Sequence, residues 1–383
     1  MKDSFEATVR AISSEGFGVV DHPNGKIFFV PEVWKGDQGR FEVVDEKSKY
    51  GTARLVELKN GFDGRRPSPC VHFGFEAGQC GGCPWIFVPY EQQLIEKQSK
   101  VEQQLLRHEI VDSKDSIKQI WGAPNEFSFR NRAQFKTDGK RIGYVTPRTN
   151  TLAPIENCMI LNSKMQSLFE ELKSTLPRED WIPDQSRPWR FVDVDDSIDS
   201  VEQIVSSKKL SFRQGNTEQN EAMRKWLAEQ TAPLNKQSSV LELFCGDGNF
   251  TQVLADQGFE KIIAVEVGRE AVQRLQKKNL KPVKAFSADL MSSKIWHWIE
   301  KNAGQPTLLV MDPPRIGFKG IRGFLNKLKT INRIIYISCS LSDFCRDAHA
   351  IQKLGFGWIH IQPVDQFPQT PHIELLAVAE RSE

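Results

Sequence analysis

The chain has 383 residues, of which 39% are hydrophobic, so its length suffices for two or three domains with a sizeable core. The formal net charge is only +2, which excludes strong overall attraction to nucleic acid, so such binding would depend on local basic patches. No apolar run approaches the roughly 20 residues of a membrane span, and the N-terminus lacks the apolar core of a signal peptide. We therefore expect a cytoplasmic protein that does not enter a membrane.

Residues 1–60 have the pattern of a small β module. Short runs rich in Val, Ile and Phe alternate with Gly, Pro and Asp turns, which is typical of a small barrel. Residues 16–19, 28–31 and 36–37 resemble parts of the TRAM module, an OB-like barrel that binds RNA. The strand pattern alone does not distinguish an RNA-binding barrel from one that only decorates an enzyme.

Four of the seven cysteines lie in the first half of the chain: Cys70, Cys80, Cys83 and Cys158. Cys80 and Cys83 flank two glycines and precede a proline, so both sulfurs can face one concave loop. In a reducing compartment, clustered thiols indicate metal binding or catalysis rather than disulfides. Soft thiolates suit zinc or an iron–sulfur cluster, and the spacing does not choose between these two or exclude unligated cysteines. We interpret His72 as structural.

Residues 90–109 form a predicted helix whose narrow apolar stripe marks a packing face, which we expect to lie against the C-terminal domain.

The chain then becomes basic, with six Lys or Arg residues between 130 and 148 against a single acid. Asp138-Gly139 predicts a hairpin turn. Such a hairpin can follow a phosphate backbone and stack on bases, although a solvated charged face is the alternative. The candidate RNA contacts are Arg130, Arg132, Phe135, Lys136 and Arg141.

The C-terminal half begins with a nucleotide-type arrangement. An apolar strand at 240–244 leads into a glycine turn at 245–249 and then a helix, which lets the backbone approach a ligand closely. The next strand ends in Glu266, an acid that can bind both ribose hydroxyls. The turn lacks both the G-x-G-x-x-G pattern and the Walker lysine, so it suits adenosine without a pyrophosphate and indicates S-adenosylmethionine. Asp289 is the candidate adenine contact. The alternative is an α/β domain that binds no nucleotide.

Three further residues lie at predicted strand ends in this half of the chain. A strand at 307–311 ends at Asp312, one at 334–338 ends at Cys339, and the last strand carries Glu374 near its start. Taken singly, Cys339 reads as a buried structural thiol and Glu374 as a solvated acid. Together with a methyl donor, a thiol nucleophile and a carboxylate base fit methylation of an unactivated pyrimidine carbon. Arg315, which follows two prolines where an amino-methyltransferase usually has an aromatic, argues against amino chemistry.

This combination resembles the RNA 5-methyluridine methyltransferase family over nearly the whole chain. Besides the barrel and the four cysteines, the resemblance lies in residues 212–216, 243–250, 312–315, 338–339 and 372–374. It implies that Cys70, Cys80, Cys83 and Cys158 bind a [4Fe–4S] cluster. It also implies that the methyl donor contacts Gln214, Phe244, Asn249, Glu266 and Asp312. The family's chemistry would make Cys339 the nucleophile and Glu374 the base.

The expected fold class is α/β, with three regions. Residues 1–60 form an N-terminal OB-like β-barrel, and residues 61–212 form a central α+β region that binds an iron–sulfur cluster and RNA. Residues 213–383 form a Rossmann-like methyltransferase domain that depends on S-adenosylmethionine. The expected function is methylation of carbon 5 of one uridine in 23S ribosomal RNA through a covalent bond from Cys339 to carbon 6. The barrel favours ribosomal RNA over the tRNA T-loop, which is the first alternative. A non-catalytic RNA-binding protein and a methyltransferase for small molecules or proteins are the others. We expect a monomer.

Overall fold

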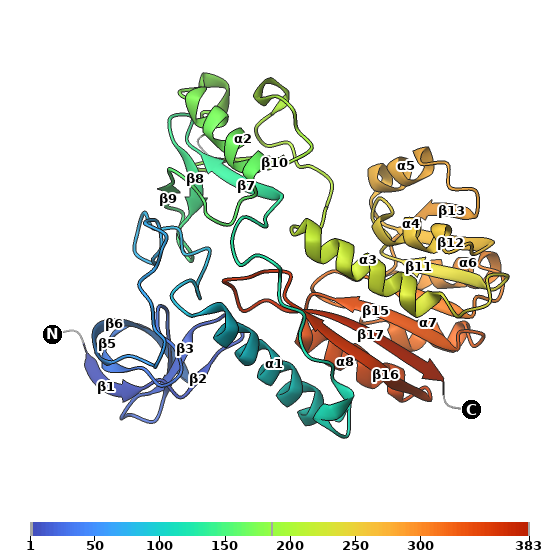
Figure 1. Ribbon diagram of the computed structural model, residues 1–383, viewed down its shortest axis with the longest axis horizontal. Coiled ribbons are helices and arrows are strands. Elements are labelled where there is room, and N and C mark those ends of the chain that lie inside the picture. The colour runs from blue at the N-terminus through green and yellow to red at the C-terminus, as the bar shows by residue number, and fades with distance from the viewer. Residues whose placement is uncertain (1–2, 185–186, 382–383) are drawn as a thin grey trace. The chain divides into compact units, whose positions relative to one another are not determined.

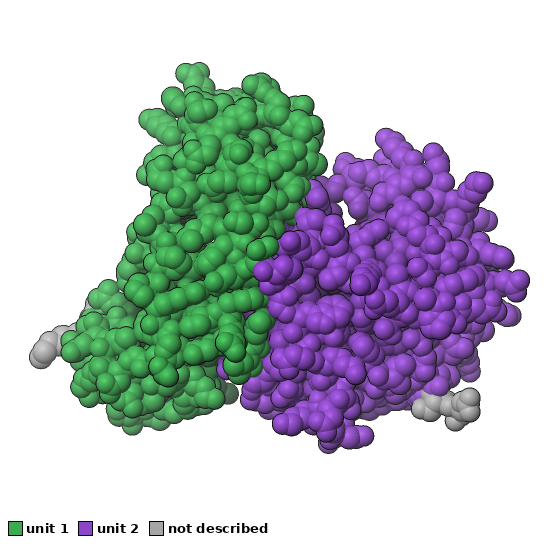
Figure 2. Space-filling model, in the orientation of Figure 1, with its two compact units in different colours: residues 1–95, 125–210, 367–371 green, residues 96–124, 211–366, 372–383 purple. Residues whose placement is uncertain are grey.

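The computed structural model describes residues 3–184 and 187–381 (Figure 1). The chain forms two compact units (Figure 2). Unit 1 consists of residues 1–95, 125–210 and 367–371, and unit 2 of residues 96–124, 211–366 and 372–383. The division differs from the three predicted regions in that the barrel and the central region share unit 1, while residues 96–124 belong to unit 2.

The N-terminal part of unit 1 is rich in strands, as the sequence predicts. Its six-stranded sheet has the order β1-β5-β6-β4-β3-β2. The strands are β1 (Ser4–Thr8), β2 (Ala11–Ile12), β3 (Gly18–Asp21), β4 (Ile27–Val30), β5 (Gln38–Glu46) and β6 (Tyr50–Asn60). Alternating residues of these strands, among them Phe5, Phe28 and Phe41, form a small apolar core.

The rest of unit 1 is built on an antiparallel sheet of order β10-β7-β8-β9. Its strands are β7 (Arg132–Thr137), β8 (Ile142–Val145), β9 (Leu152–Pro154) and β10 (Arg190–Asp195), with helix α2 (Ser163–Ser174) and 3-10 turns η2 (Glu179–Trp181) and η3 (Val201–Gln203). The predicted hairpin at Asp138-Gly139 joins β7 to β8, and the Asp138 carboxylate accepts the N–H groups of Lys140 and Arg141 at 3.0 and 2.7 Å. Helix α2 packs on one face, where Phe135 stacks on Phe169.

Unit 2 is a doubly wound α/β fold. Its sheet has the order β13-β12-β11-β14-β15-β17-β16, with five parallel strands and a C-terminal antiparallel pair. The strands are β11 (Ser239–Leu243), β12 (Lys261–Glu266), β13 (Val283–Ser287), β14 (Leu308–Met311), β15 (Arg333–Ser338), β16 (Phe356–Val364) and β17 (Glu374–Arg381). The order reverses between β11 and β14, and the carboxyl edge at such a switch point is where open α/β sheets bind ligands.

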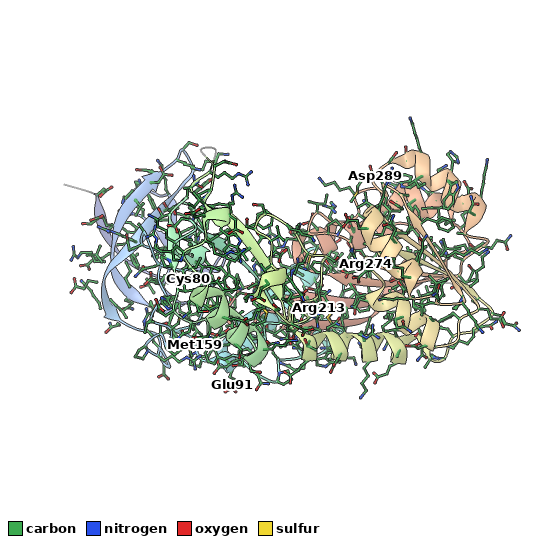
Figure 3. The ribbon with its side chains drawn as sticks, turned by 90° about the horizontal axis from the view of Figure 1, so that it is seen from above. Cys80, Glu91, Met159, Arg213, Arg274 and Asp289 are labelled. Carbon is green, nitrogen blue, oxygen red and sulfur yellow. The ribbon has the colours of Figure 1, made fainter. Side chains whose placement is uncertain are left out.

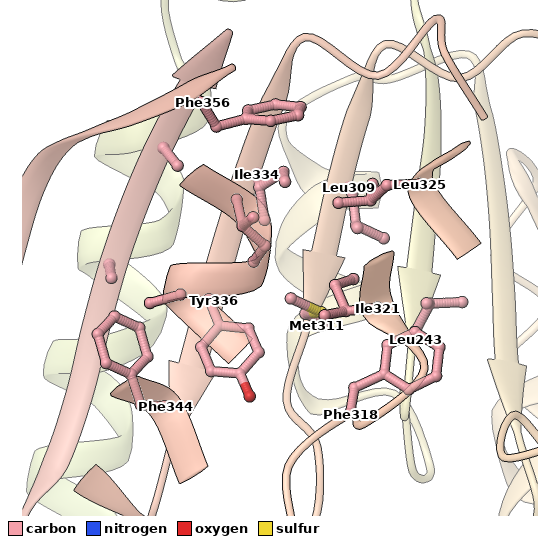
Figure 4. Close-up of a cluster of buried hydrophobic side chains, with 14 of the residues drawn as sticks. Leu243, Leu309, Met311, Phe318, Ile321, Leu325, Ile334, Tyr336, Phe344 and Phe356 are labelled. Atoms are coloured by element: carbon pink, nitrogen blue, oxygen red, sulfur yellow. The ribbon is translucent and has the colours of Figure 1, made fainter. Parts of the chain in front are cut away.

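Helices cover both faces of this sheet. They are α1 (Tyr90–Arg107), which begins in unit 1, then α3 (Thr217–Thr231), α4 (Asn249–Asp256), α5 (Arg269–Lys277), α6 (Ser293–Asn302), α7 (Ile321–Lys327) and α8 (Leu341–Gln352), with the 3-10 turn η1 (Lys114–Ser116). Successive strand residues point to opposite faces, so Ile334 and Tyr336 pack with α7 and α8 (Figure 4). Ile335 and Ile337 pack with α3 and α4 on the other face. Val101 and Leu105 of α1 belong to the first of these cores. None of the helices in the described residues combines the length and apolar character that crossing a membrane requires.

A buried ion pair anchors α1 within unit 2. The Nζ atom of Lys97 lies 2.6 Å from a carboxylate oxygen of Asp365, and both side chains are 0% exposed. Burial lowers the pKa of Lys97, and the Asp365 charge opposes this. Removing one partner of such a pair leaves an uncompensated buried charge.

We therefore expect Lys97→Ala to lower the free energy of unfolding of unit 2 by about 3–5 kcal/mol. Urea denaturation followed by circular dichroism measures this loss. The matched control is Lys164→Ala, whose exposed pair with Asp199 should contribute about 0–1 kcal/mol. Equal stability of the two variants would show that the buried pair contributes no more than the exposed one.

Candidate active site

The register of the sheet brings the two predicted catalytic residues together. In the antiparallel pair β15–β17, the ladder ends at Ser338 and its partner Leu375. Cys339 follows Ser338, and Glu374 precedes Leu375 as the first residue of β17, so both residues adjoin the last pair of the ladder. The thiol and the carboxyl group therefore come from adjacent strands at the carboxyl edge of the sheet.

Burial and charge couple Cys339, Glu374, Asp312 and Arg315. Burial raises the pKa of Glu374 well above its ordinary value, and the Asp312 charge adds to this while Arg315 opposes it. Burial also raises the pKa of Cys339 to about 12, with further increases from Glu374 and Asp312 and a decrease from Arg315. In both groups, burial favours the neutral form.

Asp312 links this pair to the glycine turn after β11. It follows β14, and its backbone N–H donates to the carbonyl oxygen of Leu243 at 3.4 Å. Burial, together with the Glu266 charge, raises the pKa of Asp312 to about 7. Three predicted site residues from different strand ends, Cys339, Glu374 and Asp312, thus share one edge of the sheet.

The turn itself has the backbone that close ligand approach requires. Phe244, Gly246 and Gly248 have φ values of +60°, +56° and +93°. A Cβ atom on Gly248 would lie 2.5 Å from Leu275 Cδ1, so only glycine fits there. The Glu266 carboxylate accepts the N–H of Gly246 at 3.2 Å and that of Gly268 at 2.9 Å, which ties the turn to the end of β12.

The other predicted cofactor residues lie in different surroundings. Gln214 is buried and accepts a hydrogen bond from Gln366 Nε2 at 3.3 Å. The Asn249 side chain exchanges two hydrogen bonds with Asn220 of α3, at 2.8 and 3.1 Å, so helix contacts occupy its amide. Asp289 is exposed in the loop after β13, where its carboxylate accepts the N–H of Met291 (Figure 3).

Two buried polar residues of unit 2 were not identified from the sequence. Glu242 lies on β11, and burial raises its pKa to about 8. Gln366 follows β16 and is 0% exposed. One carboxylate oxygen of Glu242 and the Oε1 atom of Gln366 have no hydrogen-bond partner among the described residues. An acid inside the apolar run 240–244 is a signal that could have identified Glu242, whereas nothing local marks Gln366.

The four cysteines of unit 1 line one pocket together with Tyr144 (Cys80 is labelled in Figure 3). None of them forms a disulfide. Burial raises the pKa of Cys80 to about 11, and the charges of Cys158 and Cys70 add to this, so the sulfurs are close enough to interact. Nevertheless, no three His, Cys, Asp or Glu side chains among the described residues converge as the ligands of a single ion. His72 is structural, since its Nε2 atom accepts the N–H of Glu156 at 3.0 Å.

Most of the side chains predicted to contact RNA instead form ring contacts, ion pairs or hydrogen bonds within unit 1. Phe135 is fully buried and stacks on Phe169, so its ring supports the sheet, and we withdraw it as a base-stacking residue. Arg132 forms an ion pair with Asp193 at 2.7 Å, and Arg141 one with Asp138 at 2.7 Å. Arg130 donates through Nε to the carbonyl oxygen of Arg132.

Lys136, like Arg132 at the start of β7, faces the side of the sheet opposite α2. It lies 5.0 Å from the ring centroid of Trp189 and 5.5 Å from that of Phe191. Sequence reasoning missed both rings, because a strand pattern does not say which aromatic residues a helix will cover.

The raised pKa of Cys339 has a measurable consequence. We expect its alkylation by iodoacetamide to be slow at pH 7 and to rise as the pH approaches the pKa of about 12. Because the Glu374 charge raises this pKa, Glu374→Gln should move the profile to lower pH. Peptide mapping by mass spectrometry separates Cys339 from the other thiols. A profile that Glu374→Gln leaves unchanged would show that the two groups do not interact.

Comparison with known proteins agrees with this geometry. The sequence profile of the tRNA (uracil-5-)-methyltransferase family matches residues 190–289. An RNA methyltransferase of Nitrosomonas europaea, itself uncharacterized, is 39% identical over 378 residues, which cover 98% of this chain and 96% of that one. A 23S rRNA (uracil(1939)-C(5))-methyltransferase of Pseudomonas fluorescens is 26% identical over 98% of this chain and 94% of its own.

Among solved structures, the tRNA (uracil-54, C5)-methyltransferase of Pyrococcus abyssi in complex with S-adenosyl-L-homocysteine has the same fold. Its TM-score is 0.70 at 19% identity, and the match covers 98% of this chain and 99% of that one. The similarity to the Nitrosomonas protein covers 98% of this chain and therefore extends over both units. The chain therefore belongs to the RNA 5-methyluridine methyltransferase family and has the α/β fold of an S-adenosylmethionine-dependent methyltransferase.

Proposed function

We propose that this protein methylates carbon 5 of a uridine in 23S ribosomal RNA. The observation that supports the proposal is that Cys339 and Glu374 adjoin the last pair of the β15–β17 ladder, where the charges of Glu374 and Asp312 both act on Cys339. Relatives named as 23S rRNA uracil-C5 methyltransferases align with this chain over almost its full length, which favours ribosomal RNA. The protein would act as a monomer in the cytoplasm, with its N-terminal sheet forming an OB-like barrel that contacts RNA.

The chemistry follows from the properties of uracil. Carbon 5 is a poor nucleophile, so the Cys339 thiol would first lose its proton to solvent and add through its sulfur to carbon 6, and the electrons of the C5=C6 bond would move toward carbon 5 and the carbonyl at carbon 4. S-adenosylmethionine, when bound, would supply its sulfonium methyl group to carbon 5 and leave as the neutral thioether. Glu374 then removes the proton on carbon 5, the double bond re-forms, and the bond from carbon 6 to Cys339 breaks. Burial, which raises the pKa of Glu374, makes its carboxylate a better proton acceptor.

The residues proposed to hold S-adenosylmethionine are Gln214, Phe244, Asn249, Glu266, Asp289 and Asp312, of which Phe244, Glu266 and Asp312 lie at the ends of β11, β12 and β14. Glu266 already accepts two backbone N–H groups, and each carboxylate oxygen can accept a further bond from a ribose hydroxyl. The left-handed backbone at Phe244 and Gly246 opens the turn to close approach. The uridine must leave its stack to reach Cys339 beside this site.

We also propose that Cys70, Cys80, Cys83 and Cys158 hold a [4Fe–4S] cluster. Such a cluster takes one thiolate on each iron, so its ligands do not converge on a single point. That requirement fits four free thiols that line one pocket yet form no single-ion site among the described residues. The cluster would cross-link the loop at 70–83 to the segment that carries Cys158. Iron and acid-labile sulfide analysis of the purified protein tests this assignment.

Nucleoside mass spectrometry with position mapping, on RNA from cells with and without this gene, tests the function. Loss of one 5-methyluridine from 23S ribosomal RNA is the expected result. Loss from tRNA would keep the chemistry and change the substrate, an alternative that the family profile and the Pyrococcus structure favour. Loss from neither RNA would contradict the proposal and favour a non-catalytic RNA-binding protein.

A further inference from the structure

One face of the β10-β7-β8-β9 sheet is not covered by α2. Helix α2 packs against Phe135, Val192 and their neighbours, and strand residues that alternate with these point to the other side. On that side Gln134 is exposed, and Lys136 donates to its Oε1 atom at 2.7 Å. Phe191, the cross-strand partner of Lys136, lies there half-buried, as does Trp189, which precedes β10.

The strands contribute charges of both signs to this side: Arg132 and Lys136 are basic, and Asp193 and Asp195 are acidic. Asp193 shares the face, but its carboxylate accepts two hydrogen bonds from Arg132, at 3.1 and 2.7 Å, and one from the N–H of Leu210 at 3.0 Å. The N–H of Ser207 donates to the carbonyl oxygen of Phe191 at 2.8 Å. This bond brings the exposed Lys208 and Lys209 alongside β10.

Five residues therefore bring ring surface and positive charge to this part of unit 1: Lys136 and two rings on the sheet side opposite α2, and two exposed lysines in the segment beside β10. We name this surface the basic–aromatic face and define it by Lys136, Trp189, Phe191, Lys208 and Lys209. We propose that it binds a single-stranded segment of the substrate RNA, with bases stacking on the two rings and phosphates contacting the lysines. The proposal rests on the proposed function, because it names the part of unit 1 that holds the RNA.

The chemistry of the face favours RNA as the occupant. Aromatic side chains on an open antiparallel sheet are a recurrent platform for unstacked bases, since every base offers a ring face. Lysines beside them lower the free energy of a phosphate backbone that follows the same surface. The ion pair between Arg132 and Asp193 removes the carboxylate charge that would otherwise repel phosphate.

The test measures binding of a fluorescein-labelled single-stranded oligouridylate to the full-length protein by fluorescence anisotropy. The first variant, Trp189→Leu/Phe191→Leu, removes the rings but keeps apolar packing, and we expect about 10-fold weaker binding for each ring lost. The second, Lys208→Glu/Lys209→Glu, changes only exposed side chains and should fold normally. It should also make the slope of log K against log salt shallower by about 1.4, as expected for two lost phosphate contacts on a single strand.

The control reverses the same number of charges at Lys164 and Lys225, which are exposed on α2 and α3. We expect Lys164→Glu/Lys225→Glu to bind within about 2-fold of the wild type. In methylation assays the face variants should show a raised KM with little change in kcat, since no residue of the face belongs to the site that holds Cys339.

Face variants that bind RNA and methylate it as the control does would overturn this inference and leave the proposed function intact. A wild-type protein that methylates no RNA would instead overturn the proposed function. The binding comparison would then still decide whether the face recognises single strands.

Discussion

Replacing Cys339 with alanine is expected to abolish methylation while leaving donor binding intact. Without the thiol, carbon 6 receives no nucleophile, so carbon 5 never becomes electron-rich enough to take the methyl group. We expect a fall in kcat of at least about 10⁴-fold, as for the loss of other covalent nucleophiles. Transfer of a labelled methyl group to RNA measures the rate, and isothermal titration with S-adenosylmethionine measures donor binding.

Cys345 provides the matched control for this variant. It is another buried thiol, on α8 rather than at a strand end, and burial raises its pKa to about 12 as well. Cys345→Ala should methylate RNA at nearly the wild-type rate. Substantial methylation by Cys339→Ala, or an equal loss in both variants, would rule out the covalent mechanism based on Cys339.

The second large effect is expected for Glu374→Gln, which should trap the enzyme on its RNA. Addition of Cys339 to carbon 6 and methyl transfer do not require the carboxylate, but removal of the carbon 5 proton does, so the adduct cannot break down. We expect kcat to fall by about 10²–10⁴-fold and a protein–RNA band of reduced mobility to appear on a denaturing gel. Glutamine has the same shape as the neutral carboxyl group that burial favours at this position, so the fold should tolerate it.

The double variant Cys339→Ala/Glu374→Gln separates this adduct from other cross-links. It should give no shifted band, because the proposed bond runs through the Cys339 sulfur. A shifted band in the double variant would place the bond at another residue. Wild-type turnover by Glu374→Gln would assign the proton to a different base, and Asp312 would then be the neighbouring candidate, since its pKa is about 7.

Much of the structure of unit 2 can be predicted from short stretches of sequence. The apolar runs at 240–244, 261–266 and 334–338 become buried strands, because side chains that face two covered sides of a sheet must all be apolar. The turn at 245–249 is equally local, since its glycines adopt the left-handed conformations that they favour. Strand ends at one edge then predict that Glu266, Asp312 and Cys339 lie near the same site.

In unit 1, local sequence patterns do not predict which side chains the helix covers or which distant residues meet. The run of basic and aromatic residues between 130 and 148 predicts a hairpin correctly, yet the pattern does not say which face α2 will cover. Phe135 is consequently a core residue, while Phe191 and Trp189, about 50 residues further along the chain, lie beside Lys136. The ion pair of Arg132 with Asp193 could not be predicted from local sequence either, because the two residues meet only through the pairing of β7 with β10.

The sequence by itself determined the elements, the cofactor turn and the chemical types of the candidate catalytic residues, because hydrophobic period, glycine conformation and residue chemistry are local properties. Only the tertiary structure decided that β17 lies between β15 and β16, which brings Glu374 and Cys339 to the same end of the β15–β17 ladder. It also decided that Lys97, far from Asp365 in the chain, neutralises that residue inside unit 2. Strand order and buried pairing depend on contacts between distant segments, and no local pattern encodes which segments will meet.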